Sequence, residues 1–159
     1  MDIRSALKTQ YRAALAMLRQ AIERCPDEVW TSGVHPRNYW RIAYHTVFYA
    51  RLYLEPGETS FTKWEMDRST CEALCGSPEV MLPYTQQELT EYIDRLTDSV
   101  DRSVDNLDLD SVSTGFSWYP NMTKLEHQIL NIRHLQGHVG QLSELLMSNG
   151  IDVDWMGKR

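Results

Sequence analysis

The chain has 159 residues, of which 42% are hydrophobic and 24% charged, which are ordinary values for a globular protein. This length is enough for one domain with a core and too short for two of ordinary size, so we expect a single domain over residues 1–159. The formal net charge of −6 argues against a nucleic-acid partner, which needs a basic surface.

We expect neither a signal peptide at the N-terminus nor a membrane-spanning helix. The first residues, MDIRSALKTQYRAALAMLRQ, mix apolar and charged positions, unlike a signal peptide. No stretch reaches the roughly 18 apolar residues of a membrane span, so we expect a cytoplasmic protein without a membrane partner.

Three cysteines, Cys25, Cys71 and Cys75, are an odd number and lack the dense pattern of a secreted disulfide scaffold, so we expect reduced thiols. Cys71 and Cys75 could share one face of a helical turn and bind metal. No second Cys or His pair lies nearby to complete a tetrahedral zinc site, which leaves their role open.

The first half of the chain predicts two helices. Apolar residues recur at spacings of three and four over a segment that Pro26 ends, which is typical of a helix burying one stripe: Ile3, Leu7, Tyr11, Ala14, Leu15, Leu18 and Ile22. A second helix is predicted from about Asn38 to Leu54, before Pro56-Gly57. It is apolar on most sides and should lie deep in the fold.

The second half predicts two more helices. The third has a seam close to a heptad repeat, made of Leu89, Ile93, Leu96, Val100, Val104 and Leu107. The fourth should begin near Asn121 or Thr123, where Thr123 and Glu126 form a capping box, and end at Gly150. Its predicted core stripe is Met122, Leu125, Ile129, Ile132, Leu135, Val139, Leu142 and Leu146.

No strand pairs compete with these segments, so we predict an all-α fold, a four-helix bundle. Long connections follow the second and third helices, at about residues 55–85 and 108–120. Connections of this length usually have a function or contain short helices of their own. The first is apolar enough to pack over one end of the bundle, and a short helix is expected around Trp64 to Leu74.

Three of the five histidines fall in the last predicted helix. At 100° per residue, one polar stripe beside the apolar seam contains His127, Asn131, His134, His138 and Gln141. His134 and His138 are four residues apart, so their imidazole rings can converge on one ion.

The third ligand should come from another helix, and His45 is the best candidate. It lies in the middle of the apolar second helix, where an unpaired imidazole would be costly. We therefore predict one divalent metal ion between His45, His134 and His138.

Simpler interpretations of these histidines exist. A single buried histidine is more often a hydrogen-bonded core residue, and histidine pairs at this spacing also arise by chance on surfaces. His127 lies two turns from His134, about 10 Å along the axis, which suits a pocket wall or a hydrogen-bonding group better than a ligand. His35, before Pro36, is expected to be solvated.

Two segments resemble the DinB/YfiT-like superfamily of metalloenzymes. They are WRIAYHTVFYARLYL at residues 40–54 and NIRHLQGHVGQL at 131–142, and the helix spacing and length extend the resemblance over nearly the whole chain. The resemblance implies an up-down-down-up four-helix bundle, often a homodimer, with nickel or zinc held by His45, His134 and His138. Val139 follows His138 where some relatives have another histidine, which leaves the triad intact.

Characterised members of that superfamily include metal-dependent transferases and isomerases that use low-molecular-weight thiols such as bacillithiol or mycothiol. The resemblance therefore implies a metal-dependent transferase that acts on a small molecule with a thiol cofactor. Three neutral histidines leave a coordination position open, as in catalytic sites, where a metal ion activates bound water or thiol. Four further residues are candidates to orient ligands or line the pocket: Tyr49, His127, Asn131 and Gln141.

Three alternatives stay open from the sequence. One is a metal-dependent hydrolase, which is weakened because Glu126 and Glu144 lie outside the histidine stripe and no acid–base pair is evident. The second is a non-catalytic metal- or ligand-binding helical bundle. The third is a helical interaction module that binds no metal.

Overall fold

The computed structural model describes residues 2–159, in which every regular element is helical. The elements are α1 (Ile3–Glu23), α2 (Asp27–Trp30), α3 (Tyr39–Tyr53), the 3₁₀ helix η1 (Glu58–Ser60), α4 (Gln86–Asn106) and α5 (Lys124–Met147). The predicted all-α class is confirmed. Within the described residues, no helix is both long enough and apolar enough to cross a membrane.

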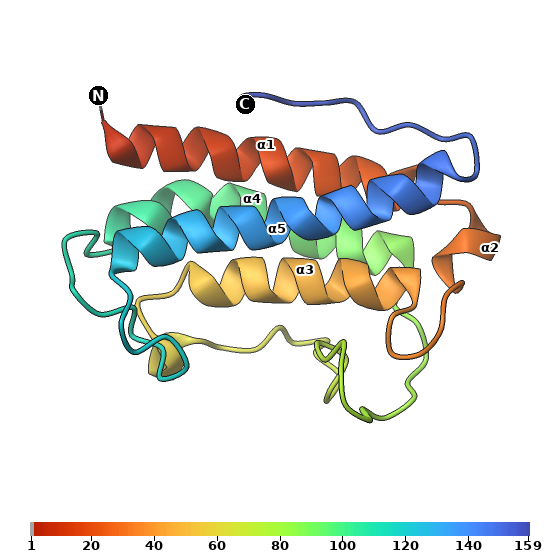
Figure 1. The fold of residues 1–159 in the computed structure, drawn as a ribbon, viewed down its shortest axis with the longest axis horizontal. Helices are drawn as coiled ribbons and strands as arrows, with labels where there is room; N and C mark the ends of the chain where they lie inside the picture. The colour runs from red at the N-terminus through yellow and green to blue at the C-terminus, as the bar shows by residue number, and fades with distance from the viewer. Residues whose placement is uncertain (1) are drawn as a thin grey trace.

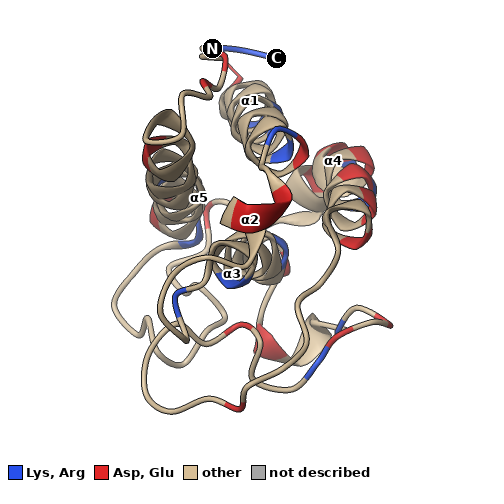
Figure 2. Ribbon diagram, turned by 90° about the vertical axis from the view of Figure 1, so that its right-hand side faces the viewer, with Lys and Arg blue, Asp and Glu red and all other residues tan. Residues whose placement is uncertain are grey.

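The four long helices lie side by side (Figure 1). α1 and α5 run in one direction and α3 and α4 in the other. α1 packs against α4 and α5, and α3 packs against α5 and α4, so the four surround one core in the end-on view (Figure 2). This arrangement places the face of α5 that carries the histidines against α3.

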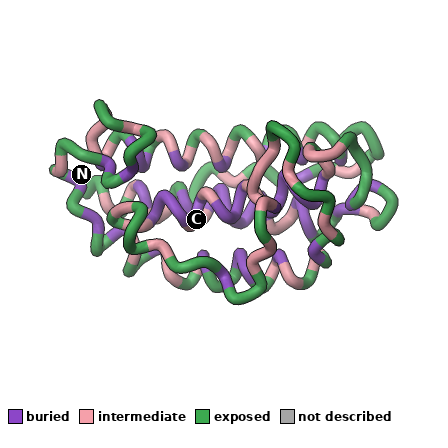
Figure 3. The backbone as a smooth tube through the Cα atoms, turned by 90° about the horizontal axis from the view of Figure 1, so that it is seen from below, coloured by how far each residue is buried: buried purple, intermediate pink, exposed green. Residues whose placement is uncertain are grey.

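The buried residues lie mainly on the long helices, whereas the connections are mostly exposed or half-buried (Figure 3). All six residues of the predicted α4 seam are buried. The charged residues of α4 lie on its outer surface, as Figure 2 shows for Asp and Glu. On α1 the predicted stripe is buried apart from its first member, Ile3, which is 45% exposed at the first position of the helix.

The helix ends follow local signals in the sequence. The Thr85 and Thr123 side chains accept hydrogen bonds from the backbone N–H groups of Glu88 and Glu126, whose carboxylates return the contact. These capping boxes satisfy N–H groups that have no partner inside the helix. Neither α2 nor η1 was predicted, because segments of four and three residues are too short to show a periodic pattern.

The predicted stripe of α5 is confirmed in the second half of the helix, where Leu135, Val139, Leu142 and Leu146 are buried, but not in the first half. Ile129 is 48% exposed, and Met122, Leu125 and Ile132 are only half-buried. The helix instead buries the polar residues His127, Gln128 and Asn131.

Hydrogen bonds to α3 explain this rotation of α5. Gln128 Nε2 donates to the Tyr53 carbonyl at 2.9 Å, and Asn131 Nδ2 donates to the Ala50 carbonyl at 3.0 Å. These carbonyls belong to the last turn of α3, where they have no partner within the helix. The Tyr11 hydroxyl of α1 donates to Gln128 Oε1 at 2.8 Å, so α5 joins both neighbours through polar groups.

The connection between α3 and α4 runs along the side of α3, not over one end as predicted (Figure 1). The predicted short helix around Trp64 to Leu74 is absent from this fully described segment, which forms turns. Thr70 has a positive φ of 64°, which interrupts any helix. The buried Arg41 guanidinium donates to the carbonyls of Thr70 and Cys71, so a side chain takes the acceptors that a helix would use.

Aromatic contacts also hold this connection in place. Trp64 stacks on Tyr92 of α4 with ring centroids 4.4 Å apart, and Tyr84 stacks on Tyr44 of α3 at 4.5 Å. The segment between them is thereby fixed beside the middle of α3, where His45 lies.

The connection between α4 and α5 meets the end of α3 at Gly115. Gly115 has a positive φ of 78°, and its carbonyl accepts a hydrogen bond from the Glu58 N–H at 3.1 Å. A Cβ atom at this position would overlap the Pro56 carbonyl and approach Gly57 Cα to 2.9 Å. Only glycine fits this contact between the two connections.

We expect Gly115→Ala to lower the free energy of unfolding by about 2–3 kcal/mol, because it adds both backbone strain and a clash. Gly137→Ala is the matched control. Nothing lies within 4 Å of a Cβ at Gly137 in α5, so that change should stabilise the helix by up to about 1 kcal/mol. Urea denaturation of the two variants measures both effects, and equal midpoints would contradict this prediction.

Candidate metal centre

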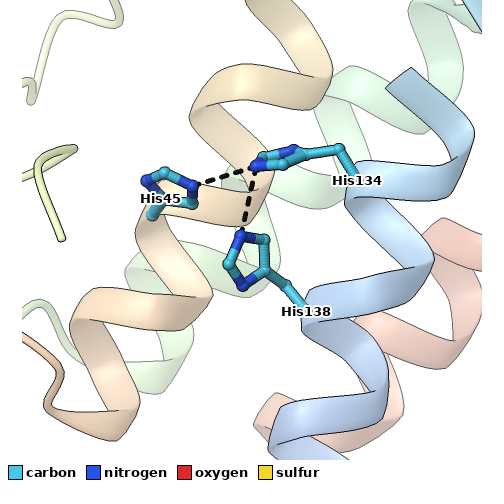
Figure 4. A group of neighbouring side chains, drawn as sticks. All are labelled: His45, His134 and His138. Carbon is cyan, nitrogen blue, oxygen red and sulfur yellow. Dashed lines mark hydrogen bonds between the residues drawn. The ribbon is translucent and has the colours of Figure 1, made fainter. Parts of the chain in front are cut away.

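His45, His134 and His138 come together between α3 and α5 (Figure 4). The Nε2 atoms of His45 and His134 are 3.0 Å apart, and those of His138 and His134 are 3.1 Å apart. One nitrogen from each ring lies within 4.8 Å of the others, and this is the only such group of His, Cys, Asp or Glu in residues 2–159. The predicted grouping of the three histidines is confirmed.

The outer nitrogens of two of these rings have acceptors that determine the tautomer. His45 Nδ1 donates to the Glu72 carbonyl at 2.6 Å, and a carbonyl oxygen can only accept. His138 Nδ1 donates to Gln141 Oε1 at 2.8 Å. A proton on Nδ1 leaves the lone pair on Nε2, so both rings direct a lone pair toward His134.

His134 faces both of these lone pairs with its own Nε2. A neutral imidazole carries one proton and can satisfy one of the two, while His134 Nδ1 is buried without a hydrogen-bond partner in the described residues. Metal–nitrogen bonds of about 2.0–2.1 Å at angles of about 90–109° place neighbouring ligand nitrogens about 2.8–3.4 Å apart. The observed distances of 3.0 and 3.1 Å match that spacing, so these residues fit a metal ion.

All three imidazoles are neutral at pH 7. Burial lowers the pKa of His45 to about 3 and that of His134 to about 4, and neighbouring histidines add to both effects. Burial also lowers the pKa of His138. The positive charge of Arg37 acts in the same direction on His45 and His138. Neutral imidazole is the form that binds metal ions.

Two of the four predicted accessory residues contact the triad. Tyr49 follows His45 by one turn, and its half-buried ring lies 4.6 Å from the His45 ring and 5.7 Å from the His134 ring. Gln141 holds the outer nitrogen of His138. Asn131 instead joins α5 to α3 through its amide, while its Oδ1 is buried without a partner in the described residues.

His127 lies in a separate aromatic cluster. It is fully buried, with its ring 4.6 Å from Tyr53, 4.9 Å from Phe116 and 5.3 Å from Tyr119. Neither of its nitrogens has a hydrogen-bond partner within residues 2–159. The expected hydrogen-bonding role is therefore not seen in the described part of the chain.

The burial of His127 makes stability depend on pH. Burial, with a smaller effect of the Lys124 charge, lowers its pKa from 6.5 to about 4. Between these pH values the unfolded chain binds a proton that the folded chain lacks, so stability falls as the pH drops below 6.5. We expect wild type to lose about 2 kcal/mol more than His127→Phe between pH 7 and pH 5.

Urea denaturation of both proteins at several pH values tests this expectation. All other ionisable groups are the same in both proteins, so the difference between the two curves isolates His127. If the free energy of unfolding falls equally with pH in both proteins, His127 has the same pKa in the folded and the unfolded chain, and this expectation is wrong.

Models of known protein families give no match to this chain. None of the curated proteins matches it either. What the site can do is therefore inferred from its own residues.

Nothing in the amino-acid sequence indicates that Glu72 contacts His45. Its carbonyl holds His45, and its side-chain Oε2 is buried without a hydrogen-bond partner in the described residues. Glu72 lies in an irregular segment 27 residues after His45, where helical periodicity has no meaning. An acidic residue in a long connection was the only available signal.

The expectations for His35 and for the cysteines can also be compared with the structure. His35 is not simply solvated, because it is half-buried and its Nε2 lies 2.9 Å from the Pro78 carbonyl. The three cysteines are free as expected, with Cys25 and Cys71 buried and Cys75 exposed. Cys71 and Cys75 belong to no group of metal ligands in residues 2–159.

Proposed function

We propose that this chain is a divalent-metal-dependent enzyme of the DinB/YfiT-like type, in which His45, His134 and His138 hold one nickel or zinc ion. The observation that supports it is the convergence of three neutral Nε2 atoms, two of them oriented by hydrogen bonds on the far side of the ring. In this proposal the four long helices form an up-down-down-up bundle, and the chain acts as a cytoplasmic homodimer.

We propose a thiol-dependent transfer reaction on a small molecule. When bound, the ion would make a coordinated thiol or water more acidic, supplying a nucleophile near neutral pH. Tyr49 is placed to orient a bound molecule beside the triad. Burial raises the pKa of Tyr49, so its hydroxyl stays protonated near neutral pH. It can therefore donate to a ligand.

A metal-dependent hydrolase is the second candidate, and Glu72 is the observation that favours it. Its buried and unpartnered Oε2 belongs to the residue whose carbonyl holds His45. A buried carboxylate without a hydrogen-bond partner can accept a proton from a reacting water. The sequence had shown no such group.

Metal analysis tests the proposal. Protein purified without a polyhistidine tag and reconstituted with nickel, zinc, iron or manganese should retain one ion per chain. The loaded protein is then assayed with thiols plus electrophiles, and separately with esters and amides. Transfer supports the first candidate and hydrolysis the second. Stoichiometric metal without any turnover would identify a non-catalytic metal-binding protein, and no retained metal would contradict the proposal.

A further inference from the structure

A shallow, open groove of about 500 Å³ lies between the first turn of α3 and the second half of α5. It is lined by Arg37, Ile42, Gly140, Gln141, Glu144 and Leu145. Ile42 precedes His45 by about one turn of α3, and Gln141 follows His138 by about one turn of α5. Because the two helices are antiparallel, both positions lie on the same side of the triad (Figure 1).

The same parts of the chain hold the groove and the metal centre in place. Gln141 lines the groove and also holds His138 Nδ1. Arg37 Nε donates to the Leu74 carbonyl at 3.3 Å, two residues beyond the Glu72 carbonyl that holds His45. One short segment therefore positions both the guanidinium and a histidine ligand. A small molecule in this groove would lie about one helical turn, roughly 5 Å, from the ion.

Arg37 is the group in this groove that is free to bind an anion. Its side chain is exposed and forms no ion pair in residues 2–159, where its only side-chain hydrogen bond uses Nε. The other guanidinium N–H groups remain available for a carboxylate, which they match in geometry. Ile42 and Leu145 supply apolar surface for the part of a molecule between the ion and the charge.

We propose that this groove selects small molecules that carry a carboxylate, with Arg37 binding the carboxylate while a thiol at the other end of the molecule reaches the metal centre. This inference rests on the proposed function and names its substrate class. Glu144 lies one further turn along α5 and also lines the groove. Its negative charge disfavours a second anionic group there, so one carboxylate near the triad is the preferred pattern.

Two thiols of equal length test the proposal with cobalt-loaded protein. 4-Mercaptobutyrate and 4-mercaptobutanol differ in the carboxylate alone, and binding of either thiolate to cobalt is followed by absorption in the near ultraviolet. We expect wild type to bind the acid about tenfold more tightly than the alcohol, as a hydrogen-bonded ion pair allows. In Arg37→Gln the two affinities should agree within about twofold, and Arg37→Lys should be intermediate.

Arg102→Gln is the matched control. Arg102 is also exposed and forms no ion pair in residues 2–159, but it lies on α4, away from the triad. This variant should keep the preference for the acid. Equal affinities in wild type would overturn the inference alone. So would a preference that survives in Arg37→Gln, because the carboxylate would then bind the metal directly. Failure of cobalt to bind would overturn the proposed function, and this inference with it.

Discussion

Replacing His134 or His138 by alanine is expected to weaken binding of a divalent ion by about 100-fold or more, because two imidazoles remain where three converge. Bound metal also stabilises the fold. At a free concentration 100 times the Kd, an ion adds about 2.7 kcal/mol, which raises the Tm of a chain of this size by about 5–10 °C. Isothermal titration and thermal unfolding with and without nickel or zinc measure the two effects independently.

A graded set of controls separates loss of a ligand from general damage. Gln141→Ala removes the acceptor for His138 Nδ1 but no ligand, so metal affinity should fall by about tenfold. His35→Ala changes a histidine outside the triad and should leave the affinity as in wild type. If the His134 or His138 variants keep the wild-type affinity and metal-dependent rise in Tm, these residues do not hold the ion.

Tyr44→Ala is expected to lower the free energy of unfolding by about 4 kcal/mol, which is typical of emptying a large aromatic site in a core. Tyr44 is fully buried and stacks on Tyr84, and its ring also lies within 6.5 Å of Trp64 and Tyr92. The substitution therefore loosens the contact between α3 and the connection that follows it. Urea denaturation monitored by circular dichroism measures the loss.

Tyr44→Phe is the matched control, since it keeps the ring and removes only the hydroxyl that donates to Asp67. Its cost should be about 1–2 kcal/mol. The same pair probes the metal centre, because the Glu72 carbonyl that holds His45 belongs to this connection. Tyr44→Ala should weaken metal binding more than Tyr44→Phe does. Equal stabilities of the two variants would show that the ring stacking contributes little.

Several features of the fold followed from local patterns alone. The four long helices appear where apolar spacing and capping residues predict them, since a helix depends on contacts within a few residues. The spacing of His134 and His138 is local in the same sense, because residues four apart always share a helix face. Membership of the DinB/YfiT-like superfamily, by contrast, stays a prediction.

Other features needed the packed molecule. Which face of α5 is buried depends on the carbonyls at the end of α3. These carbonyls accept hydrogen bonds from Gln128 and Asn131, so these two residues are buried and Ile129 is not. The path of the connection after α3 depends on Arg41 and on aromatic stacking with α4. No pattern in that irregular segment encodes either contact.

The chain's amino-acid order was thus enough to place three histidines on two helices and to predict that they meet. Tertiary packing decided how they meet, because the Glu72 carbonyl comes from a distant segment and sets the tautomer of His45. It also brought Arg37 to the edge of the same site. Helix periodicity is a short-range property, whereas the orientation of an imidazole depends on acceptors that only the folded chain brings near.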